Sequence, residues 1–147
     1  MISELTMTRG WLEAVTERDD ARLCALSDPA IRLYGGFYWS DLRAKHGRVG
    51  PISAHDGHVA LTRWLEGVRL RYLAPKVAYR GNERLMVVHD TLWFDADGDV
   101  SASSESGSVF SIESGRVTSY SRYDEPDLLV RGGFRGVDPI PLKGAQA

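Results

Sequence analysis

Cysteine and long apolar runs are scarce in this sequence, and each scarcity excludes a class of protein. The one cysteine, Cys24, excludes an intramolecular disulfide and a zinc site made of several cysteines. No apolar run approaches the roughly 20 residues that a membrane-spanning helix requires. The first residues also lack the charged start and continuous apolar run of a signal peptide. We therefore expect a cytoplasmic protein that does not bind a membrane.

An excess of either charge is also missing. The 18 basic and 20 acidic residues are interspersed along the chain and leave a net charge of −2. Nucleic-acid-binding proteins usually carry a basic patch or stripe, so we expect no nucleic-acid partner. The chain has 147 residues, of which 43% are hydrophobic, and this size and composition predict one domain over residues 1–147.

The first half of the chain has mainly helical patterns. Apolar residues recur at helical spacing over 6–26, and the Asp19-Asp20 pair predicts a break that divides this segment into two helices. A strand is expected over 31–39, and a loop that could form a pocket rim over 40–54. A third helix is expected from Asp56, which can cap it, to Arg71. Its buried face would carry Val59, Leu61, Trp64, Leu65 and Val68.

The second half is dominated by strand patterns. A short strand over 76–80 precedes three longer strands over 85–94, 100–112 and 117–124, which are rich in Val, Thr, Tyr and Phe. Tight turns that contain Gly98 and Gly115 join the three strands, because glycine accepts the positive φ of hairpin turns. We expect a helical turn over 128–130 and an irregular tail over 132–147.

Strand periodicity predicts which of these residues share a face, because residues two apart in a strand point to the same side. If His89 points inward, so do Val87, Thr91 and Trp93 of the same strand. For the next two strands, the inward set that the family resemblance described below favours is Ser104, Ser106, Ser108 and Phe110, followed by Tyr120, Arg122 and Asp124. Aromatic walls with a few convergent polar groups are the usual composition of a small-molecule site.

Two segments of the sequence are informative together: WLEAVTERDDARLCALSDPAIRLYGG near the start and GSVFSIESGRVTSYSRYDEPDLL near the end. They resemble the nuclear transport factor 2-like superfamily, which includes SnoaL-like polyketide cyclases, ketosteroid isomerase and limonene epoxide hydrolase. The resemblance covers about residues 8–131. It implies an α+β fold in which N-terminal helices wrap a cone-shaped, curved antiparallel sheet, a cystatin-like α+β barrel. It also implies an apolar pocket inside the cone and a homodimer.

The residues of two known activities are replaced in this chain. Where ketosteroid isomerases have a Tyr and two Asp residues, the aligned positions are Trp11, Gly35 and Ser108. Where limonene epoxide hydrolases have an Arg-x-Asp pair, a second Asp, a Tyr and an Asn, the aligned positions are His89, Thr91, Arg122, Leu33 and Gly35. We therefore expect neither of these two enzymes.

Three residues remain as candidates for catalysis. His89 is the acid/base candidate, because the pKa of a histidine is ordinarily about 6.5. Arg122 could bind a carboxylate or stabilise an oxyanion or enolate, and Asp124 could orient His89 or act as the base. Structural roles are the alternative for all three, since a strand histidine is often simply hydrogen-bonded and Arg122 could pair with Asp124. The predicted substrate contacts are Leu33, Phe37, Trp64, Thr91, Trp93, Ser106, Ser108, Phe110 and Tyr120.

Two short patterns are compatible with metal binding, but each has a simpler explanation. His55 and His58 flank a helix start without a third ligand, so a helix cap and solvated histidines explain them. The acidic run 95–99 lacks the glutamate that a calcium loop requires at its twelfth position, and a hairpin turn explains it. We expect no metal and no cofactor.

Together these patterns favour a cofactor-independent enzyme that acts on a small hydrophobic or aromatic carbonyl compound. The chemistry would be proton transfer in a cyclisation, isomerisation or dehydration. The first alternative is a non-catalytic ligand-binding or dimerisation module of the same fold. Epoxide hydrolysis by a different set of acids is a third possibility.

Overall fold

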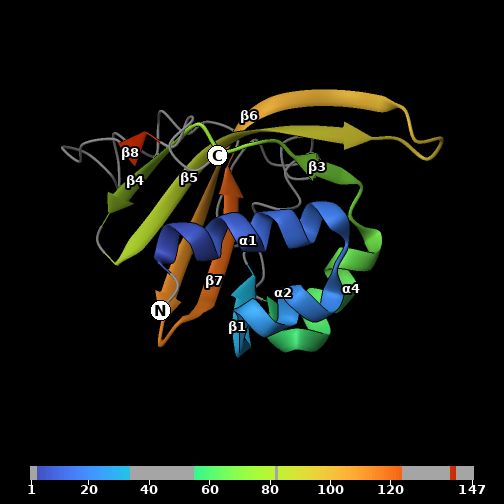
Figure 1. Ribbon diagram of the computed structural model, residues 1–147. Coiled ribbons are helices and arrows are strands. Elements are labelled where there is room, and N and C mark those ends of the chain that lie inside the picture. The colour runs from blue at the N-terminus through green and yellow to red at the C-terminus, as the bar shows by residue number, and fades with distance from the viewer. Residues whose placement is uncertain (1–2, 34–54, 82, 124–139, 142–147) are drawn as a thin grey trace.

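A computed structural model describes residues 3–33, 55–81, 83–123 and 140–141 of the chain (Figure 1). Two helices come first, followed by strands and one further helix. The elements are α1 (Glu4–Glu17), α2 (Asp20–Leu26), β1 (Ser27–Leu33), β2 (His55–Asp56), α4 (Gly57–Gly67), β3 (Leu70–Tyr72), β4 (Val77–Gly81), β5 (Arg84–Phe94), β6 (Val100–Glu113), β7 (Arg116–Tyr123) and β8 (Ile140–Pro141).

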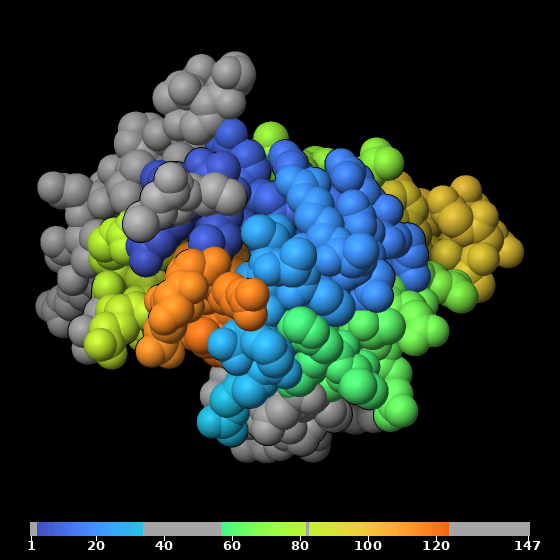
Figure 2. Space-filling view, turned by 60° about the horizontal axis from the view of Figure 1, so that its bottom comes forward, coloured from blue at the N-terminus to red at the C-terminus, as the bar shows by residue number. Residues whose placement is uncertain are grey.

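All described strands join one curled sheet. The strand order is β2-β1-β7-β6-β5-β4-β8, and β3 pairs with the C-terminal part of β5. The pairs are antiparallel except β1 with β7, which run parallel. The sheet bends from β6 down to β7 and β1, and α1 crosses its concave side (Figure 1). The α1, α2 and α4 helices lie side by side on one face of the molecule (Figure 2). The predicted α+β fold with a cone-shaped sheet and N-terminal helices is confirmed.

The predicted break between the first two helices is confirmed at Arg18 and Asp19. Arg18 ends α1 in the left-handed conformation, with φ of 57°, and Asp19 caps α2 by accepting a hydrogen bond from the backbone N–H of Arg22. The Arg18 guanidinium donates to the carbonyls of Leu65 at 2.7 Å and Val68 at 2.5 Å, at the end of α4. Arg18 therefore redirects the chain after α1 and also satisfies carbonyls that the end of another helix leaves unpaired.

The structure corrects two boundaries in the first half of the chain. The first strand begins at Ser27 rather than at residue 31, directly after α2. The third helix ends at Gly67 rather than at Arg71, and Leu70–Tyr72 forms strand β3, because these residues pair with the segment Thr91–Trp93 of β5. Val59 was assigned to the buried face of this helix, but it is 71% exposed. The predicted loop over 40–54 lies outside the described residues.

The strand predictions in the second half agree with the structure, with one exception. The β4, β5, β6 and β7 strands lie within one residue of their predicted bounds, and Gly98 and Gly115 have φ of 87° and 76° in the two hairpin turns. Asp95 accepts hydrogen bonds from the backbone of Asp97 and Asp99, so the acidic run is a hairpin turn. The tail was expected to be irregular, but Ile140–Pro141 pairs with β4. The predicted turn over 128–130 lies outside the described residues.

Apolar side chains cover both faces of the sheet. The main cluster lies on the concave face under the helices and centres on Trp11, whose ring contacts those of Trp64, Phe110 and Tyr120. A second cluster of Met86, Val88 and Val109 is buried on the opposite face. Aromatic packing therefore fills the concave side near α1. The buried polar side chains of the concave face, among them His89, Ser106 and Arg122, lie at other positions along β5, β6 and β7.

Candidate functional site

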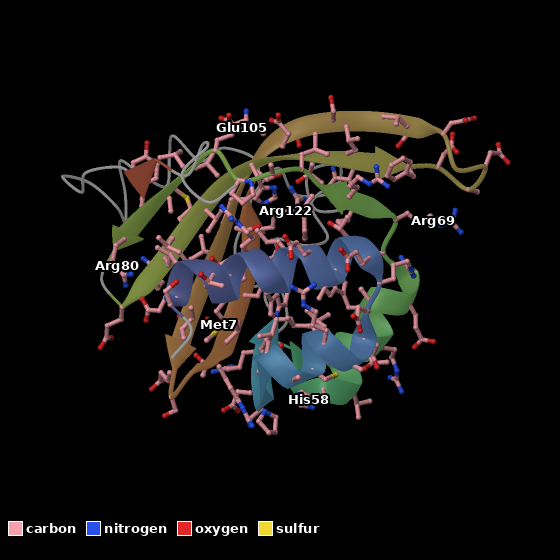
Figure 3. All side chains as sticks on the ribbon, viewed as in Figure 1. Met7, His58, Arg69, Arg80, Glu105 and Arg122 are labelled. Carbon is pink, nitrogen blue, oxygen red and sulfur yellow. The ribbon has the colours of Figure 1, made fainter. Side chains whose placement is uncertain are left out.

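The inward face predicted for β5, β6 and β7 is confirmed. His89, Thr91, Ser106, Ser108 and Arg122 are all fully buried on the concave side. The register places His89 opposite Ser106 and Ser108 opposite Arg122, so polar residues of three adjacent strands meet. Figure 3 shows Arg122 between the sheet and α1, with Glu105 on the opposite side of the sheet. Buried polar groups cost free energy unless they are paired, and these side chains pair with one another.

The first set of contacts is a chain of hydrogen bonds from Tyr72 to His89. The hydroxyl groups of Tyr72 and Tyr120 lie 2.7 Å apart, and the Tyr120 hydroxyl lies 3.0 Å from Ser108 Oγ. Ser108 Oγ lies 2.7 Å from His89 Nε2, and His89 Nδ1 lies 3.1 Å from the backbone carbonyl of Asp90. Both ring nitrogens of His89 are therefore engaged within the protein.

The second set of contacts surrounds Arg122. Its Nη1 donates to Ser106 Oγ at 3.1 Å, and Ser106 Oγ lies 2.9 Å from Thr91 Oγ1. The guanidinium also lies over the Trp93 ring, at 4.5 Å from the ring centre. A positive charge, two hydroxyl groups and an aromatic ring therefore gather at this end of the concave face, where they suit an apolar ligand that carries an anionic oxygen.

Burial sets the protonation of the titratable groups here. It lowers the pKa of His89 to about 4, and the nearby charge of Arg122 acts in the same direction, so the imidazole is neutral at physiological pH. Burial also raises the pKa of both Tyr72 and Tyr120, so their hydroxyl groups keep their protons. The low pKa of His89 differs from the value near 6.5 on which its selection as a candidate rested, and it leaves little imidazolium to act as an acid.

Tyr72 is the member of this network that the sequence analysis missed. It follows the segment that was predicted as the end of a helix, and its place opposite Thr91 depends on the pairing of β3 with β5. A local signal was present in the sequence, since Leu70, Arg71 and Tyr72 place a charged side chain between two large hydrophobic ones, as half-buried strands do.

Several predicted substrate contacts belong to the main apolar cluster, and their role as substrate contacts stays a prediction. Leu33 and Phe110 are fully buried and Trp64 is 6% exposed, and all three belong to the same cluster as Trp11. Tyr120 joins the two environments, because its ring packs in the cluster while its hydroxyl belongs to the polar chain. Phe37 and Asp124 lie outside the described residues, so the predicted contact between Asp124 and His89 stays a prediction.

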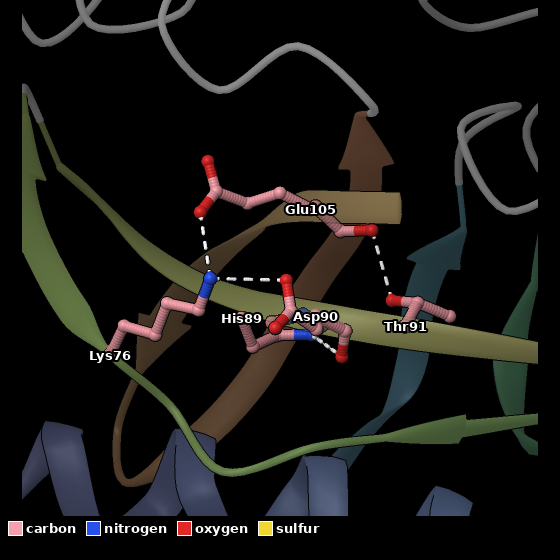
Figure 4. A network of polar contacts seen from close by, with 6 residues as sticks. Lys76, His89, Asp90, Thr91 and Glu105 are labelled. Atoms are coloured by element: carbon pink, nitrogen blue, oxygen red, sulfur yellow. Dashed lines mark hydrogen bonds and ion pairs between the residues drawn. The ribbon is translucent and has the colours of Figure 1, made fainter. Parts of the chain in front are cut away.

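A separate polar group occupies the outer face of the sheet. Lys76 Nζ lies 3.1 Å from a carboxylate oxygen of Asp90 and 2.9 Å from one of Glu105 (Figure 4). All three side chains are 40–47% exposed, so this ion-pair group is solvated and contributes little to stability. It lies on the other side of β5 from the buried network.

One cavity of about 310 Å³ lies apart from both groups, at the N-terminal end of α1. Glu4 and Arg80, which form an ion pair, line its rim, and Leu85 and Phe110 contribute apolar surface. Its remaining lining residues are Glu83, Arg84, Ser111, Ile112 and Glu113. Phe110 lines this cavity and also packs against the ring of Tyr120, whose hydroxyl belongs to the chain of hydrogen bonds.

Metal-ligating side chains do not gather in the described ranges, where no group of three or more His, Cys, Asp or Glu residues is placed to hold an ion. His58 is half-buried rather than solvated, and its Nε2 contacts the carbonyl of Ser27 at 2.9 Å. Among the residues that the structure describes, no helix is both long and apolar enough to cross a membrane.

Among the comparisons with known proteins, the comparison of structures finds similar proteins, whereas the comparisons of sequence do not. No protein-family model matches the chain, and no curated protein matches it. An NTF2-like protein of unknown function from Burkholderia pseudomallei superposes with a TM-score of 0.62 at 20% identity, covering 89% of this chain and 97% of that one. TerC, co-crystallised with polyporic acid, gives a TM-score of 0.63 at 14% identity, covering 86% and 95%. A candidate polyketide cyclase from Pseudomonas putida gives 0.62 at 12% identity, covering 84% and 92%.

These likenesses define the class of fold. The chain has the NTF2-like fold, and the structures that share it include NTF2-like proteins of unknown function and candidate polyketide cyclases. The fold that the resemblance of the two sequence segments implied is thereby confirmed. At identities of 20% or less these likenesses establish the fold, and an activity has to be argued from the residues of the concave face.

Proposed function

We propose that this protein binds a small, largely apolar carbonyl compound on the concave face and catalyses cofactor-independent proton transfer on it, as in a cyclisation. The observation that carries the proposal is the buried guanidinium of Arg122, which meets Ser106 and Trp93 where the other buried polar groups are hydroxyl groups and one imidazole. A packed core of this size does not require such a group, and burying charge is costly.

Each group has a role in this proposal. Removing a proton next to a carbonyl leaves an enolate, whose negative oxygen the guanidinium of Arg122 would stabilise. Trp93 offers a flat apolar surface at the same place, and the hydroxyl groups of Thr91 and Ser106 can bind a carbonyl oxygen. His89 acts through the Ser108 hydroxyl rather than by direct contact, because both its ring nitrogens have partners within the protein.

The structural neighbours give this proposal additional support. They include candidate polyketide cyclases from Sinorhizobium meliloti, Pseudomonas putida and Xanthomonas campestris, and TerC, which was crystallised with polyporic acid. We extend from them to this chain only the class of ligand, a small aromatic or hydrophobic carbonyl compound. The single domain, the homodimer, the cytoplasmic location and the absence of a cofactor stay predictions.

A binding experiment tests the ligand part of the proposal. Polyporic acid serves as the probe, and its affinity is measured by calorimetry for the unmodified protein, Arg122→Gln and Arg69→Gln. Arg69 is an exposed arginine that lies away from Arg122 (Figure 3), so it is a matched control for the loss of one charge. We expect Arg122→Gln to weaken binding about tenfold or more, in line with a charged hydrogen bond, and Arg69→Gln to leave it unchanged. Equal affinities of the two variants would contradict the proposal.

An exchange experiment tests the catalytic part. The protein is incubated in D₂O with benzoylacetone, an aryl 1,3-diketone, and NMR measures how fast deuterium enters the carbon between the two carbonyls. We expect the unmodified protein to accelerate exchange over buffer and Arg122→Gln to lose most of that acceleration. Binding of polyporic acid without any accelerated exchange would instead support the non-catalytic binding module, which the two internal contacts of the His89 ring favour.

A further inference from the structure

The position of one hydrogen in the site follows from the contacts of His89. Its Nδ1 lies 3.1 Å from the carbonyl oxygen of Asp90, and a carbonyl can accept a hydrogen bond but not donate one. Nδ1 must therefore carry the hydrogen. A neutral imidazole has one N–H, so Nε2 is an acceptor, and the hydroxyl of Ser108 at 2.7 Å must donate to it.

This one assignment determines the direction of the whole chain. Because the Ser108 hydroxyl gives its single hydrogen to His89, the contact of 3.0 Å between Ser108 and Tyr120 must have Tyr120 as donor. Tyr120 has then used its own hydrogen, so in the contact of 2.7 Å between the two tyrosines Tyr72 donates. Every hydroxyl in the chain donates toward His89, and the Tyr72 oxygen at the other end keeps a lone pair that can accept.

We propose that Tyr72, Tyr120, Ser108 and His89 form a directional proton relay, in which the Tyr72 hydroxyl contacts the ligand and His89 Nε2 receives the proton. This inference rests on the proposed function and assigns its proton acceptor. The ligand transfers a proton to the Tyr72 oxygen while Tyr72 passes its own to Tyr120, Tyr120 to Ser108 and Ser108 to Nε2. The deprotonated ligand and an imidazolium result, and reversal of all four transfers returns the proton to a different atom of the ligand.

The proton transfer leaves a negative charge on the ligand, and the charged side chains near the relay stabilise that negative charge. The positive charge of Arg122 acts on the hydroxyls of both Tyr72 and Tyr120, so an enolate beside Tyr72 would be stabilised by the guanidinium. Within the described residues the charged groups that act on His89 are Arg122 from β7, Asp90 from β5 and Lys76, which precedes β4. Arg122 and Lys76 disfavour a positive imidazole and Asp90 favours it.

The weakness of His89 as a base narrows the substrate class. A buried imidazole whose pKa is lowered to about 4 removes protons efficiently only from compounds that are already acidic. A carbon between two carbonyl groups, or an enolic hydroxyl conjugated to a carbonyl, meets this requirement, whereas an isolated ketone does not. A 1,3-dicarbonyl compound or its enol therefore suits both this weak base and the guanidinium that Ser106 and Trp93 hold on the same face.

The first test needs no ligand. Protein labelled with ¹⁵N in histidine is examined by NMR at neutral pH, and the His89 signals are identified by their loss in His89→Gln. We expect the Nδ1-protonated tautomer, because the relay requires an unprotonated Nε2. Signals of an Nε2-protonated ring or of an imidazolium would overturn the relay and leave the proposed function standing.

The second test uses the benzoylacetone exchange assay with three variants. Tyr72→Phe and Ser108→Ala each interrupt the relay, and Tyr79→Phe removes a hydroxyl from the opposite face of the sheet as the matched control. We expect Tyr72→Phe and Ser108→Ala to slow deuterium exchange tenfold or more, and Tyr79→Phe to exchange as fast as the unmodified protein. The affinity of Ser108→Ala for polyporic acid should change by less than about twofold. Exchange as fast in Tyr72→Phe or Ser108→Ala as in the unmodified protein would overturn the relay alone. No exchange by the unmodified protein would overturn the proposed function and the relay together.

Discussion

The guanidinium carbon of Arg122 lies 4.5 Å from the centre of the Trp93 ring, so a contact joins β7 to β5 across the strand between them. Cation–π contacts of partly desolvated groups contribute about 0.5–2 kcal/mol. We expect the free energies of unfolding of Trp93→Leu, Arg122→Gln and the double variant to show a coupling of this size, measured by urea denaturation. Strictly additive losses would mean that the ring and the cation do not stabilise each other.

The pH dependence of stability should report the burial of His89. Its pKa is about 4 in the folded protein and near 6.5 in the unfolded chain, so between these values the unfolded chain binds a proton that the folded protein does not. The free energy of unfolding that neutral His89 contributes is therefore fully present above about pH 6.5. It is lost as the pH falls toward 4, and the loss amounts to roughly 3 kcal/mol.

Asp and Glu side chains also titrate as the pH falls toward 4 and change the stability of the protein. Comparison with His89→Gln separates the effect of His89 from theirs, because both proteins carry the same carboxylates. We expect the difference in unfolding free energy between the unmodified protein and His89→Gln to shrink or change sign as the pH is lowered from about 6.5 to about 4. Urea titrations at several pH values measure it. A constant difference over that range would show that the pKa of His89 is not lowered by folding.

The sequence predicted those parts of the fold and site that depend on local patterns. The period of two within each strand, together with the family resemblance, was enough to place His89, Ser106 and Arg122 on one face. Glycines at positions 98 and 115 marked the turns between these strands.

The parts that sequence reasoning missed depend on contacts between distant segments. Strand β3 has three residues and exists because it pairs with β5, and β8 has two and exists because it pairs with β4. Tyr72 therefore escaped notice, and so did the hydroxyl chain, since its links run diagonally between strands and depend on the register. The pKa of His89 depends on its burial, which periodicity alone does not measure.

The buried indole of Trp11 depends on one hydroxyl group. Its Nε1 donates to Ser27 Oγ at 2.9 Å, and Ser27 in turn donates to the carbonyl of Leu23 at 2.7 Å. Replacing Ser27 by Ala leaves a buried N–H without its acceptor, which costs about 1–3 kcal/mol. We expect that loss in urea denaturation, and less than about 0.5 kcal/mol for the exposed control Ser103→Ala. Similar losses in the two variants would mean that the indole finds another acceptor.

Arg18 contributes to stability through two features that can be separated by two substitutions. Its backbone is left-handed, with φ of 57°, which any residue but glycine adopts at a cost of about 1 kcal/mol. Its guanidinium donates to the carbonyls of Leu65, Glu66 and Val68. Arg18→Ala removes these hydrogen bonds and keeps the backbone strain, whereas Arg18→Gly removes both.

We therefore expect both variants to be less stable than the unmodified protein, with Arg18→Gly the more stable of the two by about 0.5–1 kcal/mol. Urea denaturation measures both, and Arg18→Lys tests the guanidinium itself, because an ammonium cannot reach three carbonyls in a planar arrangement. If Arg18→Lys were as stable as the unmodified protein, a single charge near the end of α4 would account for the effect. If Arg18→Gly were instead less stable than Arg18→Ala, the left-handed backbone would not be the source of strain at this position.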